Sequence, residues 1–385
     1  MDLIYQNFDG LDVTFQGIVP EYILKQLEAA RLEAETNRHP VTIKLGYAKI
    51  PVAVAESGMR GGYRYRFDTG LDGETWCIAN SDDPEQWNIR VSVKSLSLAL
   101  HGYEGVKERL YDMLEKLGAT GSGEVNPKTG EVYDLPREAI SRVDYCFDFK
   151  TDNFEIKPEN LIAHSRCKKQ YLLPQEVVST GRHITYSRIG SMPNKQIVLY
   201  DKIREIQEKN KVFWWRIWGI EKNNFSQKIF RLEVRAGKKE LKNWNLRTFE
   251  DFEEKIGDLI LTILKEIKYV EPNLNDKNMG RWPLADFWRK AQKAAKDTLK
   301  KYISNAKRKS VVEEYKNILI ERYKKQISGM LPAYSAIIGK DDVAQIPGVL
   351  EDLANEISQQ PKKNKSKMQR KIKKAQNKFI FLDEK

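Results

Sequence analysis

The sequence predicts an α+β fold, in which mixed or antiparallel sheets carry helices on one face and a helical, basic region follows. Short runs of alternating apolar and polar residues indicate strands with one face on a core and the other face free. Segments with apolar residues at helical spacing separate these runs, so strands and helices follow one another twice along the chain. Beyond about residue 270 the alternating runs end and basic helical segments begin.

The first third of the chain is expected to hold short strands and two helices. Turns rich in Gly, Asp and Asn separate the alternating runs. Segment 121–130, with its Gly, Asn and Pro residues, predicts a flexible turn before the next strand. The expected strands cover 11–16, 41–55, 62–67, 75–79 and 88–92, and the expected helices cover 20–37 and 105–117.

The middle third is expected to contain strands with a polar face. Between two of them, residues 182–200 predict a hairpin, and 158–169, 201–209 and 248–267 predict helices. Every second residue of a strand points to the same face, so the polar residues of each run are neighbours. They are Arg142, Asp144, Cys146 and Asp148 in run 142–149, Arg231, Glu233 and Arg235 in run 230–235, and Tyr200 at the end of run 196–200.

Composition limits the classes of function that the chain can serve. Its 385 residues include 66 Lys and Arg against 54 acidic residues, a net charge of +12, which favours a nucleic acid as partner before a membrane. Three irregularly spaced cysteines indicate neither a disulfide framework nor a zinc site. The N-terminus lacks a basic segment followed by an apolar run, so we expect a cytoplasmic protein. A GxxxxGK[ST] loop is also lacking, so the chain carries no ATP motor of its own.

The carboxylates of the polar face suit a divalent metal and phosphate. Asp144 and Asp148 lie four residues apart, about 13 Å along an extended strand, so both cannot hold one ion directly. One of them with Glu233 is the expected metal pair, because Mg²⁺ needs only one or two carboxylates besides water and phosphate oxygens. The alternative is that these carboxylates form structural ion pairs with arginines of the same face, Arg142, Arg231 and Arg235.

Tyr200 is the candidate nucleophile of this face. A phenol of pKa about 10 attacks poorly at neutral pH, so it needs a metal at the phosphate or a nearby cation. Lys202, Arg204 and Lys195 are close in sequence, and Glu205 in the following helix is a candidate third ligand or proton acceptor. The alternatives are that Tyr186 is the nucleophile, that Tyr200 is a packed strand tyrosine, and that Glu205 belongs to a solvated helix face.

Three segments of the chain resemble a known family. Residues 142–148, 190–205 and 230–233, by their order and spacing, resemble the Rep-trans family of replication initiation factors, which includes rolling-circle plasmid initiators, phage initiators and relaxases of some integrative conjugative elements. The resemblance spans about residues 40–245. It implies a modified His-hydrophobe-His nuclease fold in which carboxylates replace the paired histidines, which fits the four scattered histidines here. It also implies Tyr200 as nucleophile, with Asp144 and Glu233 holding Mg²⁺ or Mn²⁺ and Asp148 and Glu205 in support.

The expected function is a rolling-circle initiator that nicks and religates one DNA strand at an origin. Tyr200 would become joined to the 5′-phosphate, with Lys202 and Arg231 assisting. The alternatives are a conjugative relaxase, a non-catalytic origin-binding initiator or repressor, and an RNA-binding protein. The last of these depends on the basic charge and on Trp214, Trp215 and Trp218, which a hydrophobic cluster on the outer rim of the sheet explains better. The residues expected to contact DNA are Arg142, Lys195, Arg204, Arg235, Arg289, Lys293 and Lys300.

Four parts of the chain follow from these expectations. Residues 1–135 are expected to be an α+β DNA-binding region and 136–270 the catalytic domain. After a linker near Pro272, residues 271–360 would form a basic helical region with helices at 284–306, 311–327 and 349–359. Residues 361–385 are strongly basic and are expected to be disordered until they bind. Origin DNA is the expected partner, and the sequence leaves open a host helicase, a second copy of the chain, and whether a plasmid or phage carries the gene.

Overall fold

A computed structural model shows two compact units, residues 1–307 and 308–385. This division differs from the expected one, because the boundary at 135/136 falls within a single sheet and the boundary at 360/361 falls within a helix. The described residues are 1–81, 83, 86–123, 134–163, 174–221, 228–273, 275–297, 299, 308–340 and 342–379.

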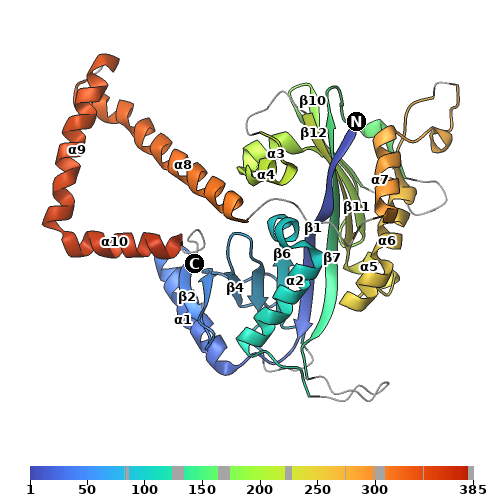
Figure 1. The fold of residues 1–385 in the computed structure, drawn as a ribbon, viewed down its shortest axis with the longest axis horizontal. Coiled ribbons are helices and arrows are strands. Elements are labelled where there is room, and N and C mark those ends of the chain that lie inside the picture. The colour runs from blue at the N-terminus through green and yellow to red at the C-terminus, as the bar shows by residue number, and fades with distance from the viewer. Residues whose placement is uncertain are drawn as a thin grey trace. The chain divides into compact units, whose positions relative to one another are not determined.

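An eleven-stranded antiparallel sheet forms the centre of the first unit (Figure 1). Its two middle strands are the longest, β1 (Asp2–Gln16) and β7 (Arg137–Thr151), and they pair along their whole length. On the β1 side follow β6 (Ile89–Val93), β5 (Thr75–Ile78), β4 (Tyr65–Asp68), β3 (Ile50–Val54) and β2 (Val41–Leu45). On the β7 side follow β12 (Lys228–Gly237), β11 (Lys195–Asp201), β10 (His183–Gly190) and β9 (Gln175–Thr180).

The two sides of the sheet have the same order of connection. In each, a long middle strand is followed by outer strands, the last of which returns to pair with that middle strand, and then by helices. The first half has the expected order of strand, helix, strands and helix; in the second half residues 158–163, expected as a helix, form a 3₁₀ turn and a short strand. The returning strands, β6 and β12, lie on opposite sides of the β1–β7 pair.

Helices cover one face of the sheet and leave much of the other open. The apolar face packs against α1 (Glu21–Asn37), α2 (Ser95–Leu117), α5 (Lys238–Asn243), α6 (Phe249–Glu266) and α7 (Asp286–Asp297). Two short helices, α3 (Lys202–Lys209) and α4 (Phe213–Trp218), lie on the opposite side of the strands from α5 to α7 (Figure 1). The expected arrangement, helices mainly on one face, is confirmed in this coarse form.

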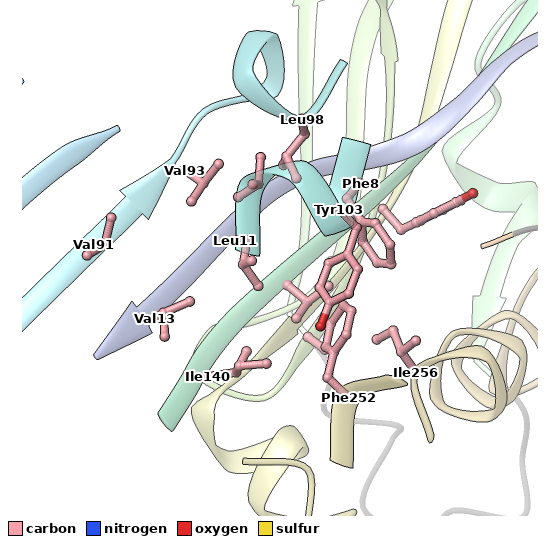
Figure 2. Packing of buried hydrophobic residues seen from close by; sticks show 14 of the residues in the cluster. Phe8, Leu11, Val13, Val91, Val93, Leu98, Tyr103, Ile140, Phe252 and Ile256 are labelled. Carbon is pink, nitrogen blue, oxygen red and sulfur yellow. The ribbon is translucent and has the colours of Figure 1, made fainter. Parts of the chain in front are cut away.

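Aromatic side chains join the sheet to its helices. Figure 2 shows Phe8 of β1 beside the stacked rings of Tyr103 of α2 and Phe252 of α6. The Phe252 ring centroid lies 4.8 Å from that of Tyr103 and 5.2 Å from that of Phe8, and all three residues are buried. Close-packed rings of this kind fix the helices against β1 and β7 and hold these strands in place beneath the open face.

Several elements differ in extent from the expected ones. Residues 158–169, expected as a helix, begin with a 3₁₀ turn at Pro158–Asn160 and continue as β8 (Leu161–Ala163), which pairs with β13 (Ile267–Tyr269); the rest lies outside the described residues. The expected strand 41–55 divides into β2 and β3 at Gly46, whose φ of 67° suits a tight turn. The helix expected at 105–117 is the second part of α2, which bends at Gly102.

The second unit is helical throughout its described length. It contains α8 (Arg308–Ile337), α9 (Ile346–Lys363) and α10 (Lys365–Lys378), and a 3₁₀ turn at Val343–Gln345 precedes α9. Where the sequence predicts a disordered tail, the structure has the helix α10, in which Lys, Arg, Gln and Ala favour the helical state and no Gly or Pro interrupts it. Helix α10 contains seven Lys or Arg residues and no acidic residue.

We predict that deleting residues 361–385 weakens duplex DNA binding and flattens its salt dependence. Each phosphate contact made by α10 would contribute about one unit to the slope of log affinity against log salt. Titrations at several salt concentrations with an unrelated duplex measure this slope. The triple substitution Lys371→Gln, Lys373→Gln and Lys374→Gln is the matched control for charge, and an unchanged slope in both proteins would contradict the prediction.

Candidate active site

Three rows of side chains cross the open face of strands β7, β12, β11 and β10. Residues that pair directly in antiparallel strands point to the same face, and so do residues two positions apart on one strand. The pairing register therefore identifies the neighbours on this face. From β7 outward the rows are Asp144–Arg235–Gln196, then Cys146–Glu233–Val198–Arg188, then Asp148–Arg231–Tyr200–Tyr186.

A buried arginine organises the third row. Arg231 and Asp148 are both fully buried, and their side chains form two parallel hydrogen bonds, Nε to Oδ1 at 2.6 Å and Nη2 to Oδ2 at 2.7 Å. Nη1 of Arg231 donates to Asp9 of β1, and the Trp218 indole donates to Oδ2 of Asp148 at 2.9 Å. The oxygens of Asp148 are thus occupied by protein donors, as the ion-pair alternative anticipated, and the structure gives no support to Asp148 as a metal ligand.

A tryptophan lies between two cations beside this pair. The Trp214 ring centroid is 4.2 Å from the Arg231 guanidinium carbon and 4.5 Å from Lys202 Nζ. Burial and the charge of Arg231 lower the pKa of Lys202, while Asp9 and Glu205 oppose that shift. Lys202 Nζ also lies 5.6 Å from the Tyr200 ring centroid, so a cation does stand next to the candidate nucleophile.

The tryptophans of α4 form a packed cluster. Trp214 and Trp215 are buried, and Trp218 lies with its ring edge-on to that of Trp215, 5.7 Å between centroids. Trp214 contacts Arg231 and Tyr5, and its burial and that of Trp215 leave neither ring free to stack on a base, whereas Trp218 is half-buried. The hydrophobic-cluster interpretation is the one that the structure supports.

Glu205 is surrounded by lysines. Its carboxylate binds Lys202 at 2.7 Å, Lys211 at 2.9 Å and Lys209 at 3.4 Å. Burial opposes ionisation, but the charges of Lys202 and Lys211 outweigh it and lower the pKa of Glu205 to about 2. The ammonium groups of these three lysines already neutralise the Glu205 carboxylate, which makes it a poor ligand for a metal ion.

Tyr200 lies on the floor of a groove of about 330 Å³ between the β9–β10 hairpin and α3. Tyr186, Arg204, Arg235 and Glu176 also line this groove. Burial raises the pKa of the Tyr200 phenol well above its usual value of 10, and the Arg231 charge opposes that shift. The phenol is therefore protonated at neutral pH in this state and must lose its proton as it attacks.

Asp144 and Glu233 form a second carboxylate pair on the same face. Asp144 accepts two hydrogen bonds from Arg142, at 2.9 and 2.6 Å, and Glu233 accepts one from Arg235 at 2.8 Å. Burial, together with the charge of Glu233, raises the pKa of Asp144 to about 7, although Arg142 opposes the shift. The two carboxylates thus repel each other even with two arginines beside them, and a shared cation would relieve this repulsion.

Gly10 makes room for the Asp144 carboxylate. A side chain at position 10 would place its Cβ 3.3 Å from Oδ2 of Asp144 and 3.6 Å from its Cγ, closer than most such contacts. The pairing of β1 with β7 shifts register between Phe8 and Gly10, so Asp9 is the extra residue of a β-bulge. The bulge directs Asp9 to Arg231, a role that strict alternation along β1 could not reveal.

Arg188 is another residue of this face outside the predicted set. It stands in the second row, its Nη2 lies 2.8 Å from Glu176, and its buried Nε has no hydrogen-bond partner among the described residues. The signal available in sequence was its position two residues after Tyr186 in an alternating run. Arg188 does not line the groove, and because its Nε is buried this N–H is not open to a phosphate.

The residues predicted to contact DNA lie on different surfaces of the protein. Arg142, Arg204 and Arg235 lie on the open face or along the groove. Lys195 instead points to the helix-covered face, where it binds Glu240 and Glu266, because it occupies an odd position of β11. The remaining three belong to the region after residue 284. Arg289 and Lys293 are exposed on α7, which packs on the helix-covered face, and Lys300 lies outside the described residues.

Within the part of the chain that the structure describes, no group of three or more His, Cys, Asp and Glu side chains forms a metal-binding cluster. Across the same residues, no helix is long and apolar enough to cross a bilayer. A metal at this site would therefore have two carboxylates, Asp144 and Glu233, as its protein ligands. Mg²⁺ accepts such a set when water and substrate phosphate complete its coordination.

Comparison with known proteins points to DNA replication. Residues 99–255 match a family model described as the N-terminal part of a replication-associated protein, a stretch that contains Asp144, Tyr200 and Glu233. This match confirms the resemblance to replication initiators that the sequence indicated. No curated protein matches the chain. A solved structure, the rolling circle replication initiator protein from Geobacillus stearothermophilus, is similar over 76% of this chain and 97% of that chain, at 16% identity and a TM-score of 0.39.

We predict that Arg231→Met lowers the free energy of unfolding by about 3–5 kcal/mol, because it leaves two carboxylates buried without their counter-charge. Urea unfolding followed by tryptophan fluorescence measures the change. Arg204→Met is the matched control: Arg204 pairs with Glu208 at the surface, and its loss should cost about 1 kcal/mol or less. A loss for Arg231→Met as small as that of the control would contradict a central role for this residue.

Proposed function

We propose that this protein initiates rolling-circle replication by nicking one strand of an origin and later rejoining it. The observation that carries the proposal is the arrangement of Tyr200 on the open face, in a groove, with Glu233 in the adjacent row and Asp144 in the row beyond it. The match of residues 99–255 to a replication-associated family supports the same function.

In the proposed reaction the phenol oxygen of Tyr200 attacks the phosphorus of a phosphodiester. A bond from that oxygen to phosphorus forms, the bond from phosphorus to the 3′-oxygen breaks, and the phenol proton ends on the freed 3′-hydroxyl. The 5′-phosphate stays on Tyr200, so the energy of the broken bond is kept for rejoining without ATP. Burial keeps the phenol neutral until DNA arrives, and Arg231 and Lys202 stabilise the negative charge that develops on its oxygen.

Asp144 and Glu233 are the residues that would hold Mg²⁺ or Mn²⁺. The bound ion would supply charge stabilisation at the scissile phosphate. The donor set fits a hard cation, since both donors are carboxylates and they repel each other where they stand. Arg142 and Arg235, which now bind these carboxylates, can then turn to the phosphate backbone.

The groove offers a path for a single strand. Arg204 and Lys209 line one wall, Arg235 its far end, and the exposed strand β9 the other wall. Cations along a groove neutralise phosphates, while the two tyrosines on its floor can stack on bases. A non-catalytic origin-binding protein would need the cations but no tyrosine beside a strained carboxylate pair, which is why nicking is the better proposal. A conjugative relaxase uses the same chemistry, and the DNA it cuts would distinguish it.

We predict that the protein forms a covalent adduct with DNA through Tyr200. Incubation with single strands from the DNA flanking its gene and Mg²⁺ or Mn²⁺ should give a slower band on denaturing gels, and EDTA should abolish it. Tyr200→Phe should lose the adduct, because only the reacting oxygen is removed, and Tyr186→Phe should keep it. An adduct retained in Tyr200→Phe would refute the assignment, and its loss in Tyr186→Phe alone would move it to Tyr186.

We predict that Asp144→Ala and Glu233→Ala reduce cleavage by at least about a hundredfold, while binding of the same strand changes only a few-fold. Glu74→Ala is the matched control, since Glu74 is a buried carboxylate that pairs with Arg109 outside the site. Cleavage rates and circular dichroism of all three variants are compared. Cleavage retained in both site variants, or equally lost in the control, would show that the carboxylates serve only the fold.

A further inference from the structure

A pocket of about 470 Å³ lies at the end of the sheet where β11 ends and β12 begins, and the proposed reaction does not use it. Phe154, Ile184 and Phe230 form its apolar part. Arg182 and Lys228 stand at its exposed rim. We call it the end pocket.

The end pocket and the Tyr200 groove share two lining residues. Thr185 and Asp201 belong to both, and Asp201 is the residue that follows Tyr200 in the chain. Asp201 and Phe230 pair with each other and alternate with Tyr200 and Arg231, so they face the helix-covered side of the sheet. A strand with its phosphate at Tyr200 therefore reaches the end pocket by turning around the end of the sheet past Thr185 and Asp201. The nucleotide adjacent to the scissile phosphate is the nearest candidate for the end pocket.

The floor of the end pocket suits a flat ring. The Phe154 and Phe230 rings stack with their centroids 4.1 Å apart and 22° between their planes. Phe230 is buried, whereas Phe154 and Ile184 are only half-buried and keep part of their surface towards the pocket. Unpaired bases bind aromatic and aliphatic surfaces of this kind in many single-strand-binding proteins.

The charges around the end pocket separate base from phosphate. Arg182 and Lys228 form no ion pair with any residue that the structure describes, so no described carboxylate neutralises them at the rim. Glu155 and Asp201 also line the pocket, Glu155 exposed at the rim as Lys157 and Glu159 are and Asp201 half-buried, and both would repel a phosphate placed next to them. The same carboxylates can accept hydrogen bonds from the amino group of a base. The positive and negative charges are both matched when the base lies inside the pocket and its phosphate lies at the rim.

We propose that the end pocket binds one unpaired nucleobase next to the scissile phosphate and thereby fixes which phosphodiester reaches Tyr200. The proposal rests on the proposed nicking function, because it takes the strand in the groove to be the substrate. It adds a specificity subsite formed by Phe154, Ile184 and Arg182, none of which takes part in the reaction itself.

The test scans a single strand with 2-aminopurine, a fluorescent base that stacking quenches. The Tyr200→Phe protein binds the strand used in the nicking assay, in EDTA, so that neither cleavage nor metal contributes. Quenching should be strongest at one position beside the scissile phosphate. Phe154→Ala should abolish that quenching and weaken binding about tenfold, but should leave unchanged the affinity for a strand that is abasic at this position.

Two further variants keep the test decisive if Phe154→Ala does not fold. Ile184→Ala trims the pocket wall, and Arg182→Ala removes an exposed rim charge; each should weaken quenching at the same position, whereas Arg60→Ala, an exposed arginine elsewhere, should not. Uniform fluorescence along a bound and cleavable strand, or equal losses on normal and abasic strands, would overturn the subsite alone. Position-specific quenching without any covalent adduct would overturn the nicking function alone.

Discussion

The guanidinium of Arg231 is the group on which the arrangement of this site depends. It is fully buried, it neutralises Asp148 and Asp9 from two different strands, and its flat face supports Trp214. A buried ion pair contributes little net stability, but one whose partner is removed is expensive. The pair therefore acts chiefly as a constraint: β1, β7, β12 and α4 can take only the positions in which every one of these charges is matched.

That constraint also sets the electrostatic environment of Tyr200. The phenol stands directly opposite Arg231 in the strand pairing and close to Lys202, so two buried cations flank it from below. Burial raises the pKa of the Tyr200 phenol; the charge of Arg231 opposes this rise, and the charges of Glu233, Asp9 and Glu205 add to it. An oxygen that is neutral at rest and stabilised as charge develops suits a nucleophile that must react only when a phosphate is in place.

Alternation was sufficient to predict the sheet face but not the contacts on it. The even positions of β7 and the odd positions of β12 do share one open face, as their sequence patterns indicate. The pattern could not place Lys195, because its position in the register, and not its nearness to Tyr200, decides which face it joins. The alternating pattern also could not identify Asp9, which a β-bulge moves into the site. Nor could it show that three lysines, from α3 and the turn that follows it, form ion pairs with Glu205. These depend on tertiary pairing, which a single sequence does not display.

The two halves of the sheet differ in how their buried carboxylates are paired. In the first half Asp12 of β1 binds both Arg90 at 2.9 Å and Ser92 at 2.6 Å, so its charge and its lone pairs are satisfied. In the second half the corresponding face carries Asp144 and Glu233 together, and their repulsion persists beside the two arginines that bind them. Stability alone favours the first arrangement, because burying like charges side by side costs free energy. The proposed metal site depends on this carboxylate pair, which lies in the half of the sheet that also holds Tyr200.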